Sequence, residues 1–252
     1  MLGQVDLPHS YYWRELYVPQ LTSGPSSAAF LADGQALVYS CGGSLWRQAI
    51  DSDEAFELTH PAGAYDYQPD VAGDGRSVVF TRYDGTRFQL WRLDLASGVE
   101  QALTDDKSVH LEPRLSPDGS RLAWVSTRGT GHFNLFIADI DARGLHRARP
   151  LLGERKSQID RYYYSAFDHA INPSWSPDGK KILYLTNQEI AWGTGDLWLV
   201  DVDRPSQRRK ILSEETSWGA RPELAPDGKR LLYSSYRGRQ WQQLWLTTPT
   251  GA

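Results

Sequence analysis

The sequence PRLSPDG at residues 113–119 and its near copy PSWSPDG at residues 173–179 decide the fold of this chain. Glycine tolerates a positive φ and aspartate hydrogen-bonds nearby backbone, so the Asp-Gly pair predicts a tight turn. The pair recurs five times, at residues 33–34, 74–75, 118–119, 178–179 and 227–228, with offsets of 41, 44, 60 and 49 residues. A repeat of this length is typical of an architecture built from one supersecondary unit.

Three further features recur in step with the Asp-Gly pair. A proline stands five residues before the aspartate in four copies, and an apolar, strand-forming run follows each pair. Each copy then carries a leucine-aromatic pair, namely Leu45-Trp46, Leu90-Trp91, Leu135-Phe136, Leu197-Trp198 and Leu244-Trp245. Another segment ends in Leu-Thr at residues 58–59 and 103–104. Each repeat therefore predicts four short strands, A to D, and the chain is predicted to be an all-β propeller of four-stranded antiparallel blades. A β-sandwich, the alternative, would require these aligned copies to be accidental.

The repeats also predict the domain organisation. Blade repeats are expected near residues 26–60, 67–105, 111–152, 171–214 and 220–252. A single propeller domain then covers residues 16–252, after an N-terminal extension at residues 1–15. The last repeat stops after its third strand, whereas residues 16–22 end in Leu-Thr as other fourth strands do. We therefore predict that residues 16–22 pair with residues 243–248 and close a five-bladed ring; the alternative is an incomplete six-bladed propeller.

Composition and charge exclude several classes of protein. A chain with 40% hydrophobic and 23% charged residues is globular in composition. The net charge of −4 argues against a nucleic-acid partner. The apolar runs are too short for membrane insertion. The single Cys41 can form neither an internal disulfide nor a cysteine-based zinc site. The sequence fits a periplasmic or secreted protein if a signal peptide was removed and a cytoplasmic one otherwise, and it predicts no oligomeric state.

The repeat resembles the TolB-like, WD40-like β-propeller family through its Pro-x-x-Ser-Pro-Asp-Gly motif, which residues 113–119 and 173–179 carry most fully. Segments such as YDYQPD at residues 65–70 and RYYYSAFDHAINPSWSPDG at residues 161–179 look like the propeller that precedes an amidohydrolase-type metallohydrolase domain in large bacterial proteins. The resemblance implies a propeller fold and a place beside a hydrolase, or a stand-alone relative. The chain itself has no H-x-H or H-E-x-x-H motif, so we predict no metal and no cofactor.

Loop lengths predict a binding face. In this family the B–C and D–A connections lie on one face, and here the long connections are residues 127–133, 153–170, 187–195 and 237–242. Loops that lengthen on one face of a repeat protein usually mark its binding face. The residues predicted there are His132, Tyr162, Tyr163, Tyr164, Phe167, Asp168, His169, Trp192, Trp218 and Trp241. Aromatic side chains of this kind anchor recognition. Alternatively, the aromatic side chains plug the propeller, and His169 is a hydrogen-bonded structural residue beside Asp168.

A second set of polar residues is predicted at the mouth of the central channel. Six residues before each Asp-Gly aspartate stand Ser27, Gln68, Glu112, Asn172 and Arg221. Asp66 and His110 lie two positions earlier in their copies, and strand alternation places them on the same side as Gln68 and Glu112. The alternative role of such a ring is to hold ordered water and satisfy strand backbone.

These patterns predict a non-catalytic recognition or scaffold module that binds a protein or a small polar ligand. The competing class is an enzyme with a channel active site on Asp66, His110 and Glu112, because glycoside hydrolysis needs a pair of carboxylates. No G-x-S-x-G nucleophile motif occurs, and we assign no catalytic residue. At the Gly42-Gly43 pair, Gly43 is expected to take over the turn if Gly42 is replaced.

Overall fold

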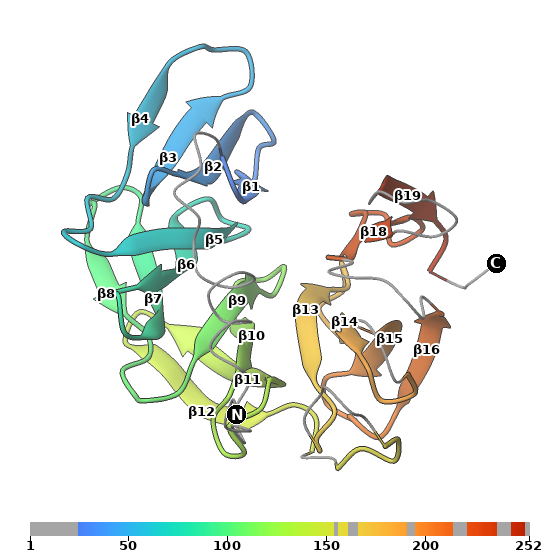
Figure 1. The fold of residues 1–252 in the computed structure, drawn as a ribbon. Helices are drawn as coiled ribbons and strands as arrows, with labels where there is room; N and C mark the ends of the chain where they lie inside the picture. The colour runs from blue at the N-terminus through green and yellow to red at the C-terminus, as the bar shows by residue number, and fades with distance from the viewer. Residues whose placement is uncertain are drawn as a thin grey trace. The chain divides into compact units, whose positions relative to one another are not determined.

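All regular elements in the described part of the chain are β-strands (Figure 1). The computed structural model describes residues 25–153, 156–160, 166–190, 195–213, 221–235 and 243–249. The strands form five sheets, four of them with four strands and one with three. The predicted fold class is therefore confirmed: this is an all-β protein with five propeller blades. None of the described residues forms a helix long and apolar enough to cross a membrane.

Each blade is a meander of strands in sequence order. Blade 1 contains β1 (Ala28–Phe30), β2 (Ala36–Cys41), β3 (Ser44–Ala49) and β4 (Ala55–Glu57). Blade 2 contains β5 (Tyr65–Val71), β6 (Ser77–Tyr83), β7 (Phe88–Asp94) and β8 (Glu100–Ala102). Blade 3 contains β9 (His110–Leu115), β10 (Arg121–Ser126), β11 (Asn134–Asp141) and β12 (Gly144–Pro150). Blade 4 contains β13 (Ala170–Trp175), β14 (Lys181–Thr186), β15 (Asp196–Asp201) and β16 (Arg208–Leu212). Blade 5 contains β17 (Glu223–Leu224), β18 (Leu231–Ser235) and β19 (Gln243–Thr247).

The described chain divides into two compact units. One unit holds residues 25–126 and 137–148, which comprise blades 1 and 2 and most of blade 3. The other holds residues 127–136 and 149–249, which comprise blades 4 and 5 and the remaining parts of β11 and β12. The predicted closing strand at residues 16–22 and the extension at residues 1–15 lie outside the described residues.

The Asp-Gly pairs form the A–B turns, as the sequence predicts. In blade 3, Gly119 adopts a φ of 70° and donates its N–H to the Ser116 carbonyl at 2.8 Å. The Asp118 carboxylate accepts the N–H of Ser120 at 3.1 Å. The same carboxylate contact recurs in all five blades, with N–H donors from Gln35, Arg76, Ser120, Lys180 and Lys229. The turn geometry therefore depends on Asp-Gly itself, because blades 1 and 2 adopt it although no proline stands immediately before the aspartate.

Hydrogen bonds connect the Leu-Thr motif of strand D to the Leu-Trp motif of strand C. The Leu45 N–H donates to the Thr59 hydroxyl at 3.0 Å. The Leu90 N–H donates to the Thr104 hydroxyl at 2.9 Å. The hydroxyl that follows strand D thus satisfies the backbone of strand C where regular pairing ends, and this explains why the two motifs recur together.

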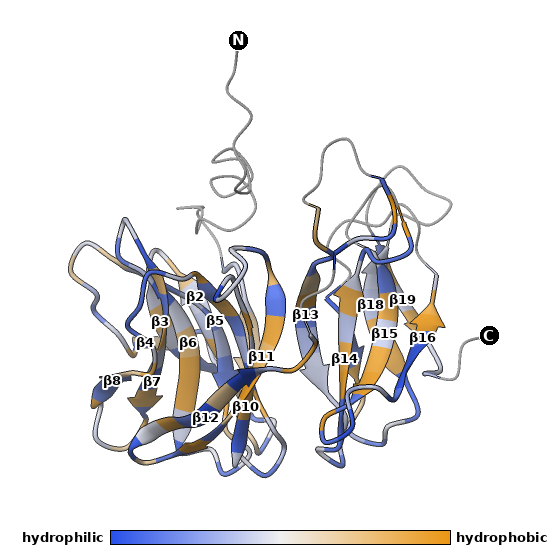
Figure 2. Ribbon diagram, turned by 90° about the horizontal axis from the view of Figure 1, so that it is seen from below, coloured by the Kyte–Doolittle hydropathy of each residue, from blue (hydrophilic) through white to orange (hydrophobic). Residues whose placement is uncertain are grey.

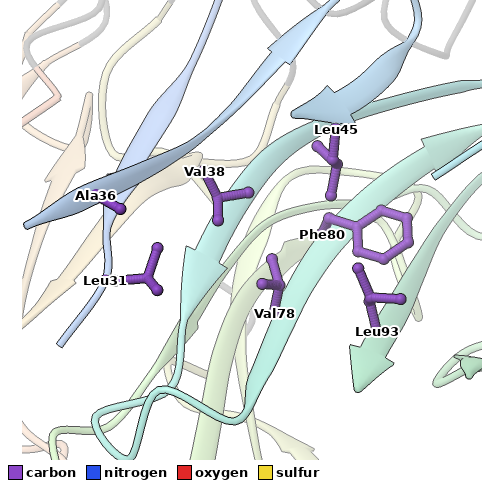
Figure 3. Packing of buried hydrophobic residues seen from close by; sticks show 7 residues of the cluster. All are labelled: Leu31, Ala36, Val38, Leu45, Val78, Phe80 and Leu93. Carbon is purple, nitrogen blue, oxygen red and sulfur yellow. The ribbon is translucent and has the colours of Figure 1, made fainter. Parts of the chain in front are cut away.

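The core lies between successive blades. In Figure 2, hydrophobic residues concentrate on strands such as β6 and β14, whereas the connecting loops are mostly hydrophilic. Figure 3 shows one interface, where blade 1 faces blade 2 through Leu31, Ala36, Val38, Leu45, Val78, Phe80 and Leu93. Val38, Leu45 and Phe80 have no exposed surface. Full burial of side chains of this size contributes roughly 1.5–3 kcal/mol each, so blade stacking supplies much of the stability.

One expectation about the turns is wrong. Both Gly42 and Gly43 adopt positive φ, at 62° and 96°. A two-residue hairpin turn of this type requires left-handed backbone at both central positions. Gly43 therefore cannot take over from Gly42, because it already occupies its own left-handed position.

Replacing the turn glycines should destabilise the fold. Gly119→Val, Gly179→Val and Gly42→Val should each lower the free energy of unfolding by roughly 1–3 kcal/mol, because a β-branched residue is strained at positive φ. At Gly119 and Gly42 an added Cβ meets nothing within 4 Å, so backbone strain alone is tested there. Chemical denaturation provides the measurement.

The matched control for these variants is Gly153→Val. Gly153 has no positive φ, and an added Cβ there also meets nothing within 4 Å. It should unfold at nearly the wild-type denaturant concentration. If all three turn-glycine variants lost as little stability as Gly153→Val, the turn assignment would be contradicted.

Candidate functional site

A hollow in the unit of blades 4 and 5 brings together four predicted binding-face residues. His132 comes from the connection between β10 and β11, and Phe167, Asp168 and His169 come from the segment before β13. The hollow is small and open to solvent. Its lining residues are Thr130, His132, Phe133, Asn134, Leu152, Gly153, Phe167, Asp168, His169, Ala170, Thr186, Gln188 and Arg208.

An aromatic stack forms one wall of the hollow. The rings of His132 and Phe167 lie with their centroids 4.7 Å apart and their planes at 25°. Partial burial lowers the pKa of His132 from its ordinary value of 6.5, so this imidazole is neutral at neutral pH. A neutral imidazole stacked on a phenyl ring gives a flat apolar surface whose edge can still donate or accept a hydrogen bond.

Backbone and amide hydrogen bonds tie the segments of the hollow to one another. The Ala170 N–H donates to the Phe133 carbonyl at 3.0 Å, which joins the start of β13 to the loop before β11. The His169 N–H donates to Asn187 Oδ1 at 3.0 Å. Asn134 Nδ2 donates to the Leu152 carbonyl at 2.9 Å. The hollow is thus a fixed junction of three loops, with Asp168 and Arg208 as charged groups on its wall.

The other residues predicted for the binding face lie outside the described residues: Tyr162, Tyr163, Tyr164, Trp192, Trp218 and Trp241. Sequence reasoning missed Thr186, Gln188 and Arg208 as lining residues. Thr186 ends β14 and Gln188 lies two residues after it, so the end of an apolar strand was a usable signal. Arg208 begins β16, and no pattern in the sequence marks it.

The predicted polar ring has an unexpected backbone conformation. Gln68, Glu112, Asn172 and Arg221 have φ values of 54°, 53°, 51° and 36°. Each of them precedes a proline. The strand register shifts at this point in blades 2, 3 and 4. Gln68, Glu112 and Asn172 are therefore left-handed residues at β-bulges of strand A. Arg221 is a left-handed residue two positions before β17, and Ser27 in the first copy has no positive φ.

The ring residues link one blade to the next. The Gln68 N–H donates to Ser27 Oγ at 2.9 Å, and the Glu112 N–H donates to Gln68 Oε1 at 2.9 Å. The Arg221 N–H donates to Asn172 Oδ1 at 3.4 Å. In each case a side chain accepts the backbone N–H of the aligned residue in the following blade. This supports the backbone-satisfying role that the sequence left as an alternative.

Asp66 is held inside a charged cluster. Its side chain is fully buried and accepts two hydrogen bonds from Arg82, at 2.6 and 2.7 Å. Arg82 also contacts Glu100 at 2.7 Å and lies over the Trp91 ring, 4.4 Å from its centroid. Burial raises the pKa of Asp66, and the bonds and charge of Arg82 oppose that rise. The carboxylate is therefore engaged within blade 2.

His110 is buried with a partner at each ring nitrogen. Its Nε2 lies 3.0 Å from Asp106 Oδ1, and its Nδ1 accepts the Trp124 indole N–H at 3.1 Å. The side-chain polar atoms of Asp66 and His110 are thus directed at partners within blade 2 and at the start of blade 3. Among the described residues, no group of three His, Cys, Asp or Glu side chains could hold a metal ion.

Comparisons with known proteins place this fold among TolB-like propellers. No protein-family model matches the chain. The Tol-Pal system protein TolB of Francisella tularensis subsp. tularensis is 25% identical over 157 residues, a match that covers 50% of this chain and 36% of that protein. The chain thus spans well under two thirds of this relative.

Solved structures show the same fold. The crystal structure of TolB from Acinetobacter baumannii superposes with a TM-score of 0.71 at 19% identity, covering 91% of this chain and 53% of that one. The putative TolB from Agrobacterium tumefaciens gives a TM-score of 0.71 at 19% identity, covering 91% of this chain and 79% of that one. The chain is thus similar to TolB proteins over part of its sequence, and it shares the β-propeller fold of the two solved structures.

The blade-linking hydrogen bonds can be tested at Gln68. Gln68→Met keeps the side-chain length but removes the acceptor for the Glu112 N–H. We expect the free energy of unfolding to fall by about 1–3 kcal/mol, because a backbone donor is left unsatisfied. Thermal and urea denaturation should agree on this loss. Gln35→Met, at an exposed turn position, is the control and should change the free energy of unfolding little. Equal losses of stability for Gln68→Met and Gln35→Met would show that Gln68 does not link the blades.

Proposed function

We propose that this chain is a non-catalytic recognition module that binds a protein partner through the hollow of His132 and Phe167. The observation that carries this proposal is the convergence of His132, Phe167, Asp168 and His169 on one hollow. Three separate loops contribute to it, and they are among the long connections from which the sequence predicts a binding face. Binding residues are commonly found on loops that a rigid scaffold positions.

The chemistry of the hollow suits a protein side chain better than a small free ligand. The stack of His132 on Phe167 offers a flat apolar surface, and Asp168 and Arg208, which carry opposite charges, also line the hollow. An amphipathic side chain with an apolar body and a hydrogen-bonding end would contact both. Aromatic side chains that become buried on binding are frequent anchors of protein interfaces.

The similarity to TolB supports a protein partner as well. The relative found by sequence is a protein of the Tol-Pal system. Components of such a system are therefore the first candidates for the partner of this chain. A small polar ligand is the second candidate, and association with an amidohydrolase-type domain stays a prediction of the sequence resemblance.

Truncating the aromatic stack should weaken binding without unfolding the protein. An immobilised chain is used to capture partners from the source cells, with Tol-Pal components quantified individually. Phe167→Ala and His132→Ala should each reduce capture of the partner at least tenfold, about 1.4 kcal/mol or more. Both side chains are partly exposed, so the melting temperature should stay close to the wild-type value.

Lys180→Ala is the control. Lys180 is exposed and lies in the turn between β13 and β14, at the other end of β14 from Gln188, and it does not line the hollow. This variant should retain the partner at the wild-type level. Retention by all three variants, or loss by Lys180→Ala alone, would contradict a site at the hollow.

A further inference from the structure

The aspartates of the A–B turns are exposed, and an Asp-Gly dipeptide can rearrange without an enzyme. The five aspartates are Asp33, Asp74, Asp118, Asp178 and Asp227. Glycine has no side chain to shield its backbone nitrogen, which can therefore attack Cγ of the aspartate before it. The N–Cγ bond forms as a Cγ–O bond breaks, and the carboxyl hydroxyl leaves as water together with the amide hydrogen.

The product of this step is a cyclic succinimide, which water then opens. Opening at the main-chain carbonyl gives isoaspartate, in which the main chain runs through Cβ and a free carboxylate remains on Cα. Cyclisation requires the neutral carboxyl, because an ionised carboxylate has no hydroxyl to leave as water. The rate at each turn therefore depends on how the glycine nitrogen and the aspartate carboxyl are held.

The glycine nitrogen is held in the same way in every blade. Each turn glycine donates its N–H at 2.8 Å to the carbonyl of the residue three positions earlier. The acceptors are the carbonyls of Leu31, Ala72, Ser116, Ser176 and Ala225. Because this bond is common to all five turns, a difference in reactivity between them depends on the surroundings of the aspartate.

A serine hydroxyl holds the aspartate carboxylate in blades 3 and 4. Ser116 Oγ donates to Asp118 Oδ1 at 2.6 Å, and Ser176 Oγ donates to Asp178 Oδ1 at 2.6 Å. A hydrogen bond of this kind stabilises the ionised carboxylate, and it is the main cause of the lowered pKa of both aspartates. The serine thus reduces the share of the neutral carboxyl that cyclises and also fixes its position.

Blades 1 and 2 have no serine at this position. Leu31 and Ala72 stand there instead. Among the described residues, the carboxylates of Asp33 and Asp74 each accept a single hydrogen bond, from a backbone N–H at 2.9 Å. Both carboxylates therefore lack the hydroxyl that holds their counterparts in blades 3 and 4.

The residue immediately before the aspartate also differs between the blades. It is Pro117, Pro177 and Pro226 in blades 3, 4 and 5, but Ala32 and Gly73 in blades 1 and 2. The proline ring fixes its own φ and leaves the turn fewer ways to deform toward ring closure. Blade 5 keeps the proline without the serine, whereas blades 1 and 2 lack both restraints.

We propose that Asp33 and Asp74 are sites of spontaneous isoaspartate formation, and that Ser116 and Ser176 protect the corresponding aspartates of blades 3 and 4. The product carries a new carboxylate on Cα, which is the group that protein isoaspartyl methyltransferases esterify with a methyl group from S-adenosylmethionine. The modification falls on the turn that sets the pairing of strands A and B. This inference is independent of the hollow and its partner.

Ageing of the folded chain tests the proposal. The wild-type protein is held at mildly acidic pH and physiological temperature, digested, and analysed by electron-transfer mass spectrometry, which distinguishes isoaspartate from aspartate. Isoaspartate should accumulate several times faster at Asp33 and Asp74 than at Asp118 and Asp178. In the urea-unfolded chain the four rates should become similar, because the dipeptide is the same and the hydrogen bonds of the turns are lost.

Ala72→Ser tests whether the serine is the cause. The Ala72 N–H donates to the Ser77 carbonyl at 2.9 Å, as the corresponding serine N–H does to its own partner in blade 3, so the new hydroxyl has the same backbone setting. This variant removes no hydrogen bond and should slow isoaspartate formation at Asp74 several-fold. Asp33 in the same molecule is the control and should react at the wild-type rate.

Ser116→Ala is the reciprocal variant. It should speed isoaspartate formation at Asp118 several-fold, with Asp178 as the unchanged control in the same chain. Ser116 Oγ also accepts the Arg121 N–H at 2.9 Å, so circular dichroism melts check that this variant is folded.

Three results would overturn the proposal. One is equal rates at the four aspartates of the folded wild type, or faster reaction at Asp118 and Asp178. Another is an unchanged rate at Asp74 in Ala72→Ser. The third is a folded chain without isoaspartate at Asp33 and Asp74 after the unfolded chain has reacted, because the glycine N–H bond alone would then block cyclisation.

Discussion

The structure depends on the Asp-Gly turn between strands A and B. In all five blades the aspartate carboxylate accepts the backbone N–H two residues ahead, and the glycine adopts a left-handed φ. This turn fixes which residues of strands A and B are paired. Because side chains alternate across a strand, a slip of one residue would exchange the core face for the solvent face. The buried positions of Val38 and Phe80 therefore follow from the turns beside them.

Left-handed residues before proline are a second constraint, and they give the polar ring its role. Gln68 and Asn172 combine a bulged backbone with an amide side chain that accepts an N–H from the next blade. A bulge leaves backbone groups unpaired, and these groups need partners in a buried setting. These side chains therefore join neighbouring blades within each unit, which accounts for polar residues at the aligned positions. Asp66 and His110, which could have served as catalytic groups, are likewise held by fixed partners.

The sequence predicted the fold well because the information is local. Asp-Gly, Leu-Thr and Leu-Trp each act on backbone groups within one blade, so their recurrence is enough to locate the strands. The aligned positions of the polar residues were predicted, but their left-handed backbone was not, because an alignment of polar residues contains no information on φ. The hollow was predicted only in part: His132 and Phe167 are 35 positions apart in the sequence, and their stacking depends on how two loops meet. Arg208 had no local signal, because its contribution depends on the packing of blade 4.

The central claim is that the hollow of His132 and Phe167 recognises a protein partner. Hydrogen–deuterium exchange of the chain with and without its captured partner tests this claim most directly, because it reads every peptide in one experiment. The account predicts that protection on binding concentrates in residues 127–134 and 166–169, while the A–B turns, such as residues 116–119, exchange at the same rate in both states. Protection confined to the turns, with residues 127–134 and 166–169 unchanged, would contradict it.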